Sequence, residues 1–459
     1  MSTICAVSTA PGIGGIAVIR VSGPEAIRLS DCVFHARNSK KQLAHLTGGT
    51  LTYGQAFNQQ GELIDEVVAA LFRAPHSFTG EDTVELSCHG SLFIQQQLLQ
   101  ALIDAGCRLA EPGEFTRRAF LNGKMDLSQA EAVADLIAST SAGQHRLALN
   151  QMRGGFSREL TQLRDQLLHI TSLMELELDF SDHEDLEFAD RSELTALANH
   201  IETKIARLVN SFSLGNAIKN GTPVAIIGET NAGKSTLLNA LLGEEKAIVS
   251  DIHGTTRDVI EDTINLSGHL FRFIDTAGIR ETTDKIESLG IARSYKALEE
   301  AEIVILMCDL SRPIQDFQAF LQQLRPHLKR QAVIVVQNKC DLHPEASPLS
   351  DLPEAWPVVR LSAKQQEGID TLRQQLLKAA QLPTLQSNDV IVSNARHYEA
   401  LTHALEAIHR VQEGLTQQLS GDFISQDLRE CIFHLSDIVG EVTTDQVLEN
   451  IFKHFCVGK

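Results

Sequence analysis

The sequence lacks the long apolar run that a membrane-spanning helix needs. No stretch of its 459 residues approaches the roughly 20 unbroken apolar residues of such a helix. The first uncharged stretch, up to position 19, has no basic segment before it, and a proline and three glycines between positions 11 and 15 interrupt it. These features argue against a signal peptide and predict a glycine turn that leads into a strand at Gly15–Val21.

Paired cysteines and an excess of basic residues are also missing. The eight cysteines are scattered without a Cys-x-x-Cys pair. In a chain of this length that pattern favours reduced thiols in the cytoplasm over disulfides or a zinc site. Forty Lys and Arg stand against fifty-nine Asp and Glu, giving a net charge of −19. This balance argues against non-specific nucleic-acid binding by a basic surface, but it leaves room for a local basic site.

What is present is the composition of a folded chain with several domains. Apolar residues make up 43% and charged residues 22%, which excludes disorder and suffices for buried cores. The length suggests about three domains. Residues 1 to about 120 combine short β-rich runs with one helical stretch, Ser91–Ala105, and predict a compact α+β domain. The β-rich runs are Ile16–Val21, Val67–Phe72 and Thr83–Ser87.

Two helical segments flank a segment in which strands and helices alternate. Apolar residues recur every three or four positions from Leu160 to Met174 and from Leu401 to Leu415, as in the helices of a bundle. The apolar runs between them predict a mostly parallel sheet buried on both faces: Val224–Gly228, Phe271–Asp275, Ile303–Asp309, Ala332–Asn338 and Val358–Leu361. We therefore predict an α/β domain inserted into a discontinuous helical domain, with segments 1–120, 121–217, 218–382 and 383–459.

A phosphate-binding loop follows the first of these strands. Residues 228–235 read Gly-Glu-Thr-Asn-Ala-Gly-Lys-Ser, which fits G-x-x-x-x-G-K-S between a strand and a predicted helix at Thr236–Leu242. In such a loop, backbone N–H groups and the helix dipole bind the phosphates. We expect Lys234 to reach the β- and γ-phosphates and the Ser235 hydroxyl to bind Mg²⁺.

Three further motifs resemble those of Ras-like GTPases. Asp275-Thr-Ala-Gly278 resembles the D-x-x-G motif, Asn338-Lys-Cys-Asp341 matches N-K-x-D, and Ser362-Ala-Lys364 resembles the S-A-K loop that closes over the base. A carboxylate at Asp341 can accept hydrogen bonds from both N1–H and the exocyclic N2–H of guanine, which adenine does not offer. The motifs therefore predict GTP as the nucleotide.

Gly254-Thr-Thr-Arg-Asp258 resembles the switch I segment of the same superfamily, with Thr256 as the second protein ligand of Mg²⁺. The whole set of residues that the resemblance assigns to GTP binding is Asn231, Ala232, Gly233, Lys234, Ser235, Thr236, Ser250, Asp251, Ile252, His253, Gly254, Thr255, Thr256, Asp275, Thr276, Ala277, Gly278, Asn338, Lys339, Asp341, Ser362, Ala363 and Lys364.

The glutamine that orients the attacking water in the Ras pattern is absent, because Ile279 occupies its position. Asn231 resembles the asparagine of potassium-activated GTPases, in which K⁺ takes the place of an arginine finger. The resemblance implies that the carbonyls of Ser250 and Ile252 and the side chain of Thr255 bind this K⁺ together with Asn231. The alternative is that Asn231 only shapes the loop by hydrogen bonding.

Glu287 is implied by the same resemblance as the residue that orients the water, beside catalytic roles for Lys234 and Asn231. The alternative is an exposed glutamate at the start of a helix. Arg257 and Arg280 are nearby in the sequence. They are at least as well explained as charges on the switch surface as they are by a role as an arginine finger.

Five blocks outside the nucleotide motifs resemble the MnmE (TrmE) family of tRNA modification GTPases. They are Phe78–Asp82, Pro112–Thr116, Arg118–Lys124, Asp126–Ala132 and the terminal Cys456–Lys459. The resemblance spans the whole chain and implies an enzyme that acts with an FAD-dependent partner, MnmG. Using GTP and a 5-formyl- or 5,10-methylene-tetrahydrofolate, the pair adds an aminomethyl or carboxymethylaminomethyl group to C5 of the wobble uridine, position 34, of certain tRNAs. GTP hydrolysis is expected to drive a conformational change.

The resemblance also implies that the N-terminal domain forms a homodimer and binds the folate through Arg20, Glu85, Lys124 and Lys459. Basic side chains suit the glutamate carboxylates of a folate, and a carboxylate suits the N–H edge of the pterin. Cys456 is expected close to this site, either as a nucleophile or as part of a restrained tail.

Two other classes of function stay open. A GTPase that assembles ribosomes would be expected to carry a basic RNA-binding module, and none is visible in the sequence. The second is a regulatory switch whose helical domain only binds partner proteins. Deleting the gene of such a switch would leave the modified nucleosides of tRNA unchanged. No net basic segment marks a tRNA-binding surface, so tRNA is expected from the resemblance alone.

Overall fold

The computed structural model describes residues 2–37, 42–179, 191–243, 262–274, 296–343, 345, 352–353, 355–380, 389–453, 455 and 458. The chain divides into two compact units. The first consists of Met1–Ala134, Met152–Leu168 and Ile432–Lys459, and the second of Asp135–Gln151 and His169–Cys431. Helical residues therefore contribute to both units.

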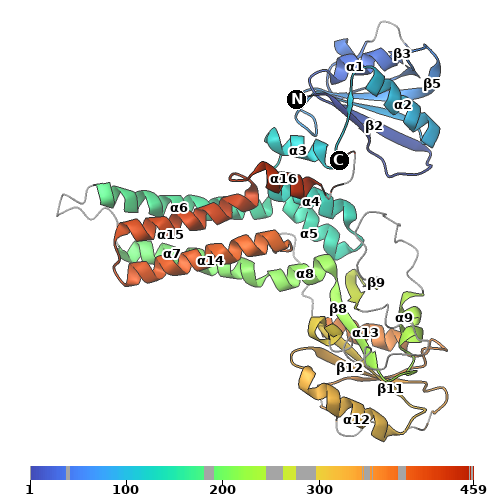
Figure 1. Ribbon diagram of the computed structural model, residues 1–459, viewed down its shortest axis with the longest axis vertical. Helices are drawn as coiled ribbons and strands as arrows, with labels where there is room; N and C mark the ends of the chain where they lie inside the picture. Colours follow the sequence, from blue (N-terminus) through green and yellow to red (C-terminus); the bar gives the residue numbers. More distant parts are fainter. Residues whose placement is uncertain are drawn as a thin grey trace. The chain divides into compact units, whose positions relative to one another are not determined.

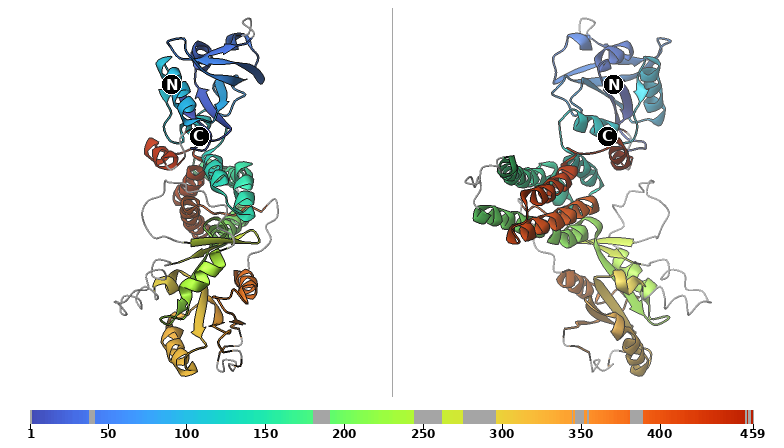
Figure 2. Two further views of the ribbon diagram at one scale, coloured as in Figure 1. Left: turned by 90° about the vertical axis from the view of Figure 1, so that its right-hand side faces the viewer. Right: turned by 60° about the vertical axis from the view of Figure 1, so that its left-hand side comes forward.

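The first unit begins with a seven-stranded, mainly antiparallel sheet in the order β3-β4-β5-β6-β2-β1-β7. Its α1 (Ala26–Val33) and α2 (Leu92–Asp104) pack on one face, on a core that includes Ile19, Val21 and Leu86 (Figure 2). The strands are β1 (Ile4–Val7), β2 (Ile16–Ser22), β3 (Phe34–Ala36), β4 (Thr50–Phe57), β5 (Leu63–Phe72), β6 (Thr83–His89) and β7 (Arg108–Leu109), and a 3₁₀ turn spans Leu43–His45. The predicted α+β domain is confirmed, although β5 begins four residues before the predicted run.

The opposite face of this sheet is covered at its β1 end by α3 (Glu114–Leu121), whose Phe115 packs on Ile4 and Ala6. Farther along the sheet, Tyr53 of β4 lies opposite Val68 of β5, and both side chains are exposed. Successive strand residues point to opposite faces, so these two lie on the side away from α1 and α2. This face therefore presents an uncovered apolar strip.

In the described residues on either side of the α/β segment, the predicted helical character is confirmed by α4 (Leu127–Ala138), α5 (Ala142–Met152), α6 (Gly155–Asp179), α7 (Arg191–Asn210), α8 (Phe212–Asn220), α14 (Ala395–Thr416), α15 (Gly421–Val439) and α16 (Asp445–Phe452). The stripe from Leu160 to Met174 is buried at each predicted position, and in the second stripe Leu405 alone is only partly buried. Within the second unit, α7 and α14 lie side by side. Over the described part of the chain, none of the helices is long and apolar enough to span a membrane.

The second unit contains a six-stranded sheet in the order β13-β12-β11-β8-β10-β9, in which all neighbours are parallel except β9 and β10. Its strands are β8 (Thr222–Gly228), β9 (Asp262–Leu266), β10 (His269–Phe273), β11 (Ile303–Asp309), β12 (Ala332–Asn338) and β13 (Val358–Arg360). The helices α9 (Lys234–Leu242) and α13 (Ile369–Ala380) cover one face, and α12 (Ile314–Leu324), followed by a 3₁₀ turn at Arg325–His327, covers the other (Figure 1). The predicted mostly parallel sheet is confirmed.

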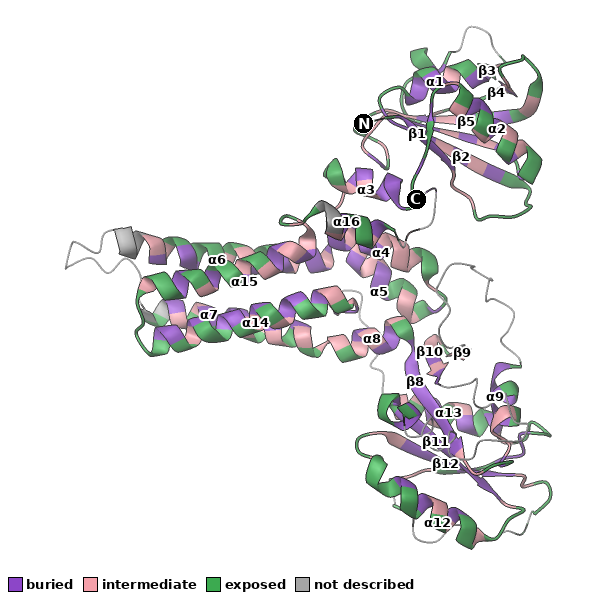
Figure 3. Cartoon of the chain, in the orientation of Figure 1, coloured by how far each residue is buried: buried purple, intermediate pink, exposed green. Residues whose placement is uncertain are grey.

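Burial explains which strands the sequence predicted well. β8 and β11 are buried along almost their whole length (Figure 3). Their apolar runs are accordingly unbroken, and β11 has the predicted bounds. β9 lies at the edge of the sheet and buries only alternate residues, so its apolar signal was too short to predict it. The run predicted at Phe271–Asp275 is β10, which ends at Phe273, and Asp275 lies outside the described residues.

Candidate functional site

The phosphate loop joins β8 to α9, and Lys234 is the first residue of that helix. Its Nζ donates hydrogen bonds to the carbonyls of Gly228 at 2.7 Å and Glu229 at 2.9 Å, so the side chain folds back over the loop. Burial lowers the pKa of the Lys234 ammonium, and the charge of Glu229 opposes that shift. The ammonium can exchange these two carbonyls for phosphate oxygens at the helix N-terminus.

Two residues of this loop have left-handed backbone conformations, Asn231 at φ +65° and Gly233 at φ +97°. A Cβ atom at Gly233 would lie 2.3 Å from Nδ2 of Asn338, so the loop requires glycine there. Asn231 is exposed, and Ser235 and Thr236 lie on the first turn of α9. The described part of the loop therefore has the form that its motif predicts.

Asn338, at the end of β12, connects the phosphate loop to the two guanine motifs. Its Nδ2 donates to the Ala232 carbonyl at 2.8 Å, and its Oδ1 accepts from the backbone N–H of Ala363 at 3.0 Å. Ser362 is fully buried, and its Oγ accepts from the N–H of Gln365. The structure therefore brings the phosphate loop, N-K-x-D and S-A-K together at the carboxyl edge of the sheet, with Asp341 and Lys364 exposed there.

One residue of this site was missed by the sequence analysis. Asp309 ends β11, and its Oδ2 lies 2.6 Å from Nζ of Lys339. A sequence signal for Asp309 was available. It is a carboxylate at the carboxyl end of a parallel strand, and that strand lies beside the one that carries the phosphate loop.

The other residues predicted to bind the nucleotide or to take part in its hydrolysis lie outside the described part of the chain. They are Ser250, Asp251, Ile252, His253, Gly254, Thr255, Thr256, Asp275, Thr276, Ala277, Gly278 and Glu287. Among the residues that are described, there is no group of three or more His, Cys, Asp or Glu side chains that could hold a metal ion. The roles of Asn231 and Ser235 toward K⁺ and Mg²⁺ stay predictions.

Two of the predicted folate residues form an ion pair on the partly uncovered face of the N-terminal sheet. Arg20 and Glu85 face each other across β2 and β6, and Nε of Arg20 lies 2.9 Å from Oε1 of Glu85. The guanidinium contacts two aromatic rings and lies 5.3 Å from the centroid of Phe78 and 5.5 Å from that of Phe115. These two cation–π contacts and the ion pair with Glu85 restrict the orientation of the arginine side chain.

The third predicted folate residue, Lys124, contacts the same loop that carries Phe78. Its Nζ donates to the Pro75 carbonyl at 2.9 Å, and its methylenes lie against Gly80. Lys459 and Cys456 are not among the described residues. Between them in the sequence, Gly458 accepts a hydrogen bond from Oγ of Ser8 at 3.0 Å, which places this part of the tail beside the end of β1.

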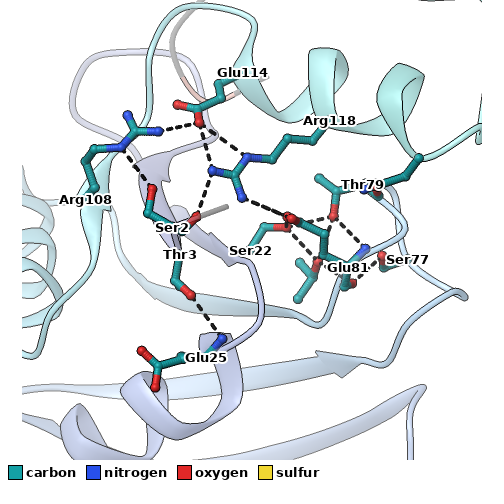
Figure 4. A network of polar contacts seen from close by, with 12 residues as sticks. Ser2, Thr3, Ser22, Glu25, Ser77, Thr79, Glu81, Arg108, Glu114 and Arg118 are labelled. Atoms are coloured by element: carbon teal, nitrogen blue, oxygen red, sulfur yellow. Dashed lines mark hydrogen bonds and ion pairs between the residues drawn. The ribbon is translucent and has the colours of Figure 1, made fainter.

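A buried network of charges holds α3 to the sheet (Figure 4). Arg118 donates to Glu114 at 2.8 Å and to both carboxylate oxygens of Glu81 at 3.1 Å, and Arg108 pairs with Glu114. Burial by itself would raise the pKa of Glu114, but hydrogen bonds from Arg108, from the backbone of Glu111 and from Arg118 bring it below its ordinary value. Glu81 also accepts from Oγ of Ser22 at 2.9 Å. The network therefore fixes the helix that carries Phe115 over Arg20.

The nucleotide-binding half of the molecule has the arrangement of a P-loop GTPase. The lysine of the phosphate loop lies at a helix N-terminus, and the N-K-x-D motif, which is predicted to bind guanine, follows a parallel strand of the same sheet. Comparison with known proteins narrows this class.

Two family models together match nearly the whole chain, "GTP-binding protein TrmE N-terminus" over residues 3–124 and "MnmE helical domain" over residues 127–456. Three relatives named tRNA modification GTPase MnmE match 100% of the chain. They come from Parabacteroides distasonis (70% identical, 100% of that protein), Bacteroides fragilis (62%, 99%) and Porphyromonas gingivalis (51%, 98%). The chain belongs to the MnmE family of tRNA modification GTPases.

One solved structure is similar to part of the chain. The FeoB G-domain from Methanococcus jannaschii is 26% identical to this chain, covers 35% of it and 97% of its own length, and gives a TM-score of 0.26.

Proposed function

We propose that this chain is a K⁺-stimulated GTP hydrolase that acts in the modification of the tRNA wobble uridine. One observation carries the proposal: Asn338 holds the phosphate loop and the S-A-K turn together, in a chain 70% identical over its full length to a tRNA modification GTPase. In this proposal residues 218–382 form the G domain, 121–217 and 383–459 the helical domain, and 1–120 the folate-binding domain.

The donor chemistry of the described residues suits the ions of such an enzyme. Ser235 supplies a hydroxyl oxygen on the first turn of α9, the hard ligand that Mg²⁺ prefers. Asn231 supplies an exposed amide at the fourth position of the loop, beside the place that the phosphates would take. A bound K⁺ would supply positive charge between the β- and γ-phosphates, where an arginine finger acts in other GTPases.

The one-carbon chemistry is proposed to take place on the N-terminal domain. The aromatic rings that hold Arg20 beside Glu85 present a fixed cation and a carboxylate on one face of the sheet, and Lys124 reaches the adjoining loop. These groups suit the carboxylates and the pterin edge of a tetrahydrofolate. An FAD-dependent protein of the MnmG type is the proposed partner that completes the modification of tRNA in the cytoplasm.

The uncovered strip of the same sheet supports the proposal of a homodimer. Leu51 and Tyr53 of β4 and Val68 of β5 are exposed side by side, and Ile16 of β2 is exposed on the same face. Contiguous exposed apolar side chains are typical of surfaces that bind another protein. A second copy would remove these side chains from water and place two candidate folate sites close to the interface.

The hairpin of β9 and β10 supports the proposal that GTP hydrolysis drives a conformational change. In the sequence it connects the predicted switch I segment to Asp275, and it contacts both the α4–α5 connection and the first turn of α5. Nδ2 of Asn265 donates to the Thr140 carbonyl at 3.1 Å, and the N–H of Gly143 lies 3.4 Å from the Gly268 carbonyl. Movement of the segments on either side of this hairpin would therefore change its contacts with Thr140 and with Gly143 of α5.

The potassium site is tested by GTP hydrolysis in matched KCl and NaCl buffers. We expect K⁺ to raise the rate of the wild type by more than about tenfold, and Asn231→Ala to lose this stimulation, because preorganised charge near the transferred phosphate is a large catalytic term. Thr230→Ala, a change of the neighbouring exposed loop residue, is the matched control and should keep the stimulation. Equal wild-type rates in the two salts would leave Asn231 as a loop-shaping residue.

The role in tRNA is tested by nucleoside analysis of tRNA from a deletion strain. The modified wobble uridine should disappear on deletion and return with the wild-type gene but not with Lys234→Ala, which removes the phosphate-binding ammonium. An unchanged nucleoside profile in the deletion strain would favour the regulatory switch over the enzyme.

A further inference from the structure

The turn that follows β11 lies between the two halves of the nucleotide site. We propose that Asp309 is a positioning residue for the guanine nucleotide: it fixes the direction of Lys339 in N-K-x-D, while Arg312 of the same turn holds the phosphate loop through Glu229. The inference rests on the proposed GTPase function of this site and adds residues to it that no nucleotide motif contains.

The carboxylate of Asp309 has partners on both oxygens. Its side chain is only 2% exposed, and Oδ2 lies 2.6 Å from Nζ of Lys339. Oδ1 accepts from the N–H of Ser311 at 2.9 Å and from its Oγ at 2.6 Å. Burial would raise the pKa of Asp309, but the hydrogen bonds from Lys339 and Ser311 lower it, so the buried group keeps its charge at neutral pH. A charged carboxylate bound at both ends cannot rotate freely and gives the lysine a fixed partner.

The backbone of Lys339 is also constrained. It has φ +65°, a left-handed conformation that side chains other than glycine, asparagine and aspartate seldom adopt. The two turns are also joined directly, since the N–H of Leu310 donates to the Asn338 carbonyl at 3.1 Å. With its ammonium anchored on Asp309, the Lys339 side chain has a fixed direction two residues before Asp341.

The other end of the turn reaches the phosphate loop. The N–H of Arg312 donates to the Asp309 carbonyl at 3.1 Å and closes the turn, and Nη1 of Arg312 lies 3.5 Å from Oε2 of Glu229. Glu229 is the second residue of the phosphate loop, and its carbonyl accepts from Lys234. One turn therefore contacts both the base motif and the phosphate loop. If both segments, N-K-x-D and the phosphate loop, are held in place before the nucleotide binds, less conformational entropy is lost on binding.

The test is Asp309→Asn, which keeps the shape of the side chain and removes its charge. We expect the full-length variant to bind GDP about tenfold more weakly than the wild type, mainly through faster release, because a charge-assisted bond to Lys339 is lost. The ratio of GDP to IDP affinity should stay unchanged, since Asp341 and not Asp309 faces the exocyclic amine in the proposed site. Glu302→Gln, the same kind of change just before the opposite end of β11, is the matched control and should bind GDP as the wild type does.

A double-mutant cycle separates positioning from general destabilisation. In a Lys339→Met background, Asp309→Asn should weaken GDP binding by less than about twofold, because its partner is already gone. Equal effects of Asp309→Asn in both backgrounds, or wild-type GDP affinity of the single variant, would overturn the inference. If Asp309→Asn does not fold, Ser311→Ala takes its place, with a two- to threefold loss of GDP affinity expected and an unchanged affinity contradicting it. A wild type that does not bind GDP at all would instead refute the proposed function.

Discussion

Arg118→Leu is expected to destabilise the N-terminal sheet by about 3–5 kcal/mol, because removing one partner of a buried ion pair leaves uncompensated buried charge. The guanidinium is 4% exposed and donates to Glu114 and Glu81, which are themselves largely buried. Leucine would fill part of the space but offers neither carboxylate a hydrogen bond. Both glutamates would then have to rely on their remaining hydrogen-bond partners.

Native-state hydrogen exchange is the suitable measurement, since the single tryptophan, Trp356, lies in the other unit. Amides of β2 and β6 should exchange about two to three orders of magnitude faster in the variant. Arg28→Leu is the matched control: its ion pair with Glu25 lies in the same domain, but the arginine side chain is 63% exposed. A solvated pair of this kind contributes less than about 1 kcal/mol. Similar exchange in the two variants would show that the buried network does not stabilise the sheet.

The same network predicts how the difference depends on pH. The folded-state pKa of Glu114 lies below its ordinary value, so its stabilising contribution is fully present above the unfolded-state pKa of about 4.3. That contribution is lost as the pH falls through the lower, folded-state pKa. We therefore expect the gap between wild type and Arg118→Leu to be constant near neutral pH and to shrink below about pH 4. A gap that is independent of pH would mean that the lost packing of Arg118, rather than its charge, causes the effect.

Glu287→Ala is expected to lower GTP turnover by about 10²- to 10⁴-fold, the usual contribution of a residue that positions or deprotonates an attacking water. The reason lies in the sequence: Ile279 stands where Ras-like enzymes carry the glutamine, so another polar group has to orient the water. Nucleotide affinity should change little, because the phosphate loop and the guanine motifs are untouched.

Two measurements distinguish a loss of catalysis from a loss of nucleotide binding: single-turnover GTP hydrolysis in KCl and the affinity for GDP. Glu299→Ala, which removes an exposed glutamate of the same predicted G domain, is the control and should hydrolyse GTP at the wild-type rate. Unchanged single-turnover hydrolysis in Glu287→Ala would remove this residue from the mechanism. A parallel loss of GDP affinity would point instead to a misfolded switch segment.

The described strands and loop of the nucleotide segment were predictable because their signals are local. The phosphate loop is one continuous segment, and the strands that position it bury both faces, so their apolar runs stand out in the sequence. β11 and β12 have the predicted bounds for this reason. Residues 250–256, 275–278 and 287 stay predictions from motif and resemblance, since they lie outside the described residues.

Long-range pairs could not be predicted in the same way. Arg118 contacts Glu81 from 37 positions away, Arg20 contacts the rings of Phe78 and Phe115, and Ser8 contacts Gly458 across 450 positions. The spacing of apolar residues predicts which face of a helix or strand is buried, but not which other helix or strand covers that face. The edge strand β9 was missed for a related reason, because a strand that buries one side gives only a weak alternation.

The sequence by itself determined the fold class, the order of its segments and the guanine-nucleotide motifs, because each depends on residues that are neighbours along the chain. Only the tertiary structure decided that Asp309 and Arg312 join the base motif to the phosphate loop. It also decided that one side of the N-terminal sheet keeps an exposed apolar strip beside the Arg20–Glu85 pair. Such contacts depend on how whole strands and helices pack, and packing is set by many weak interactions that no single segment records.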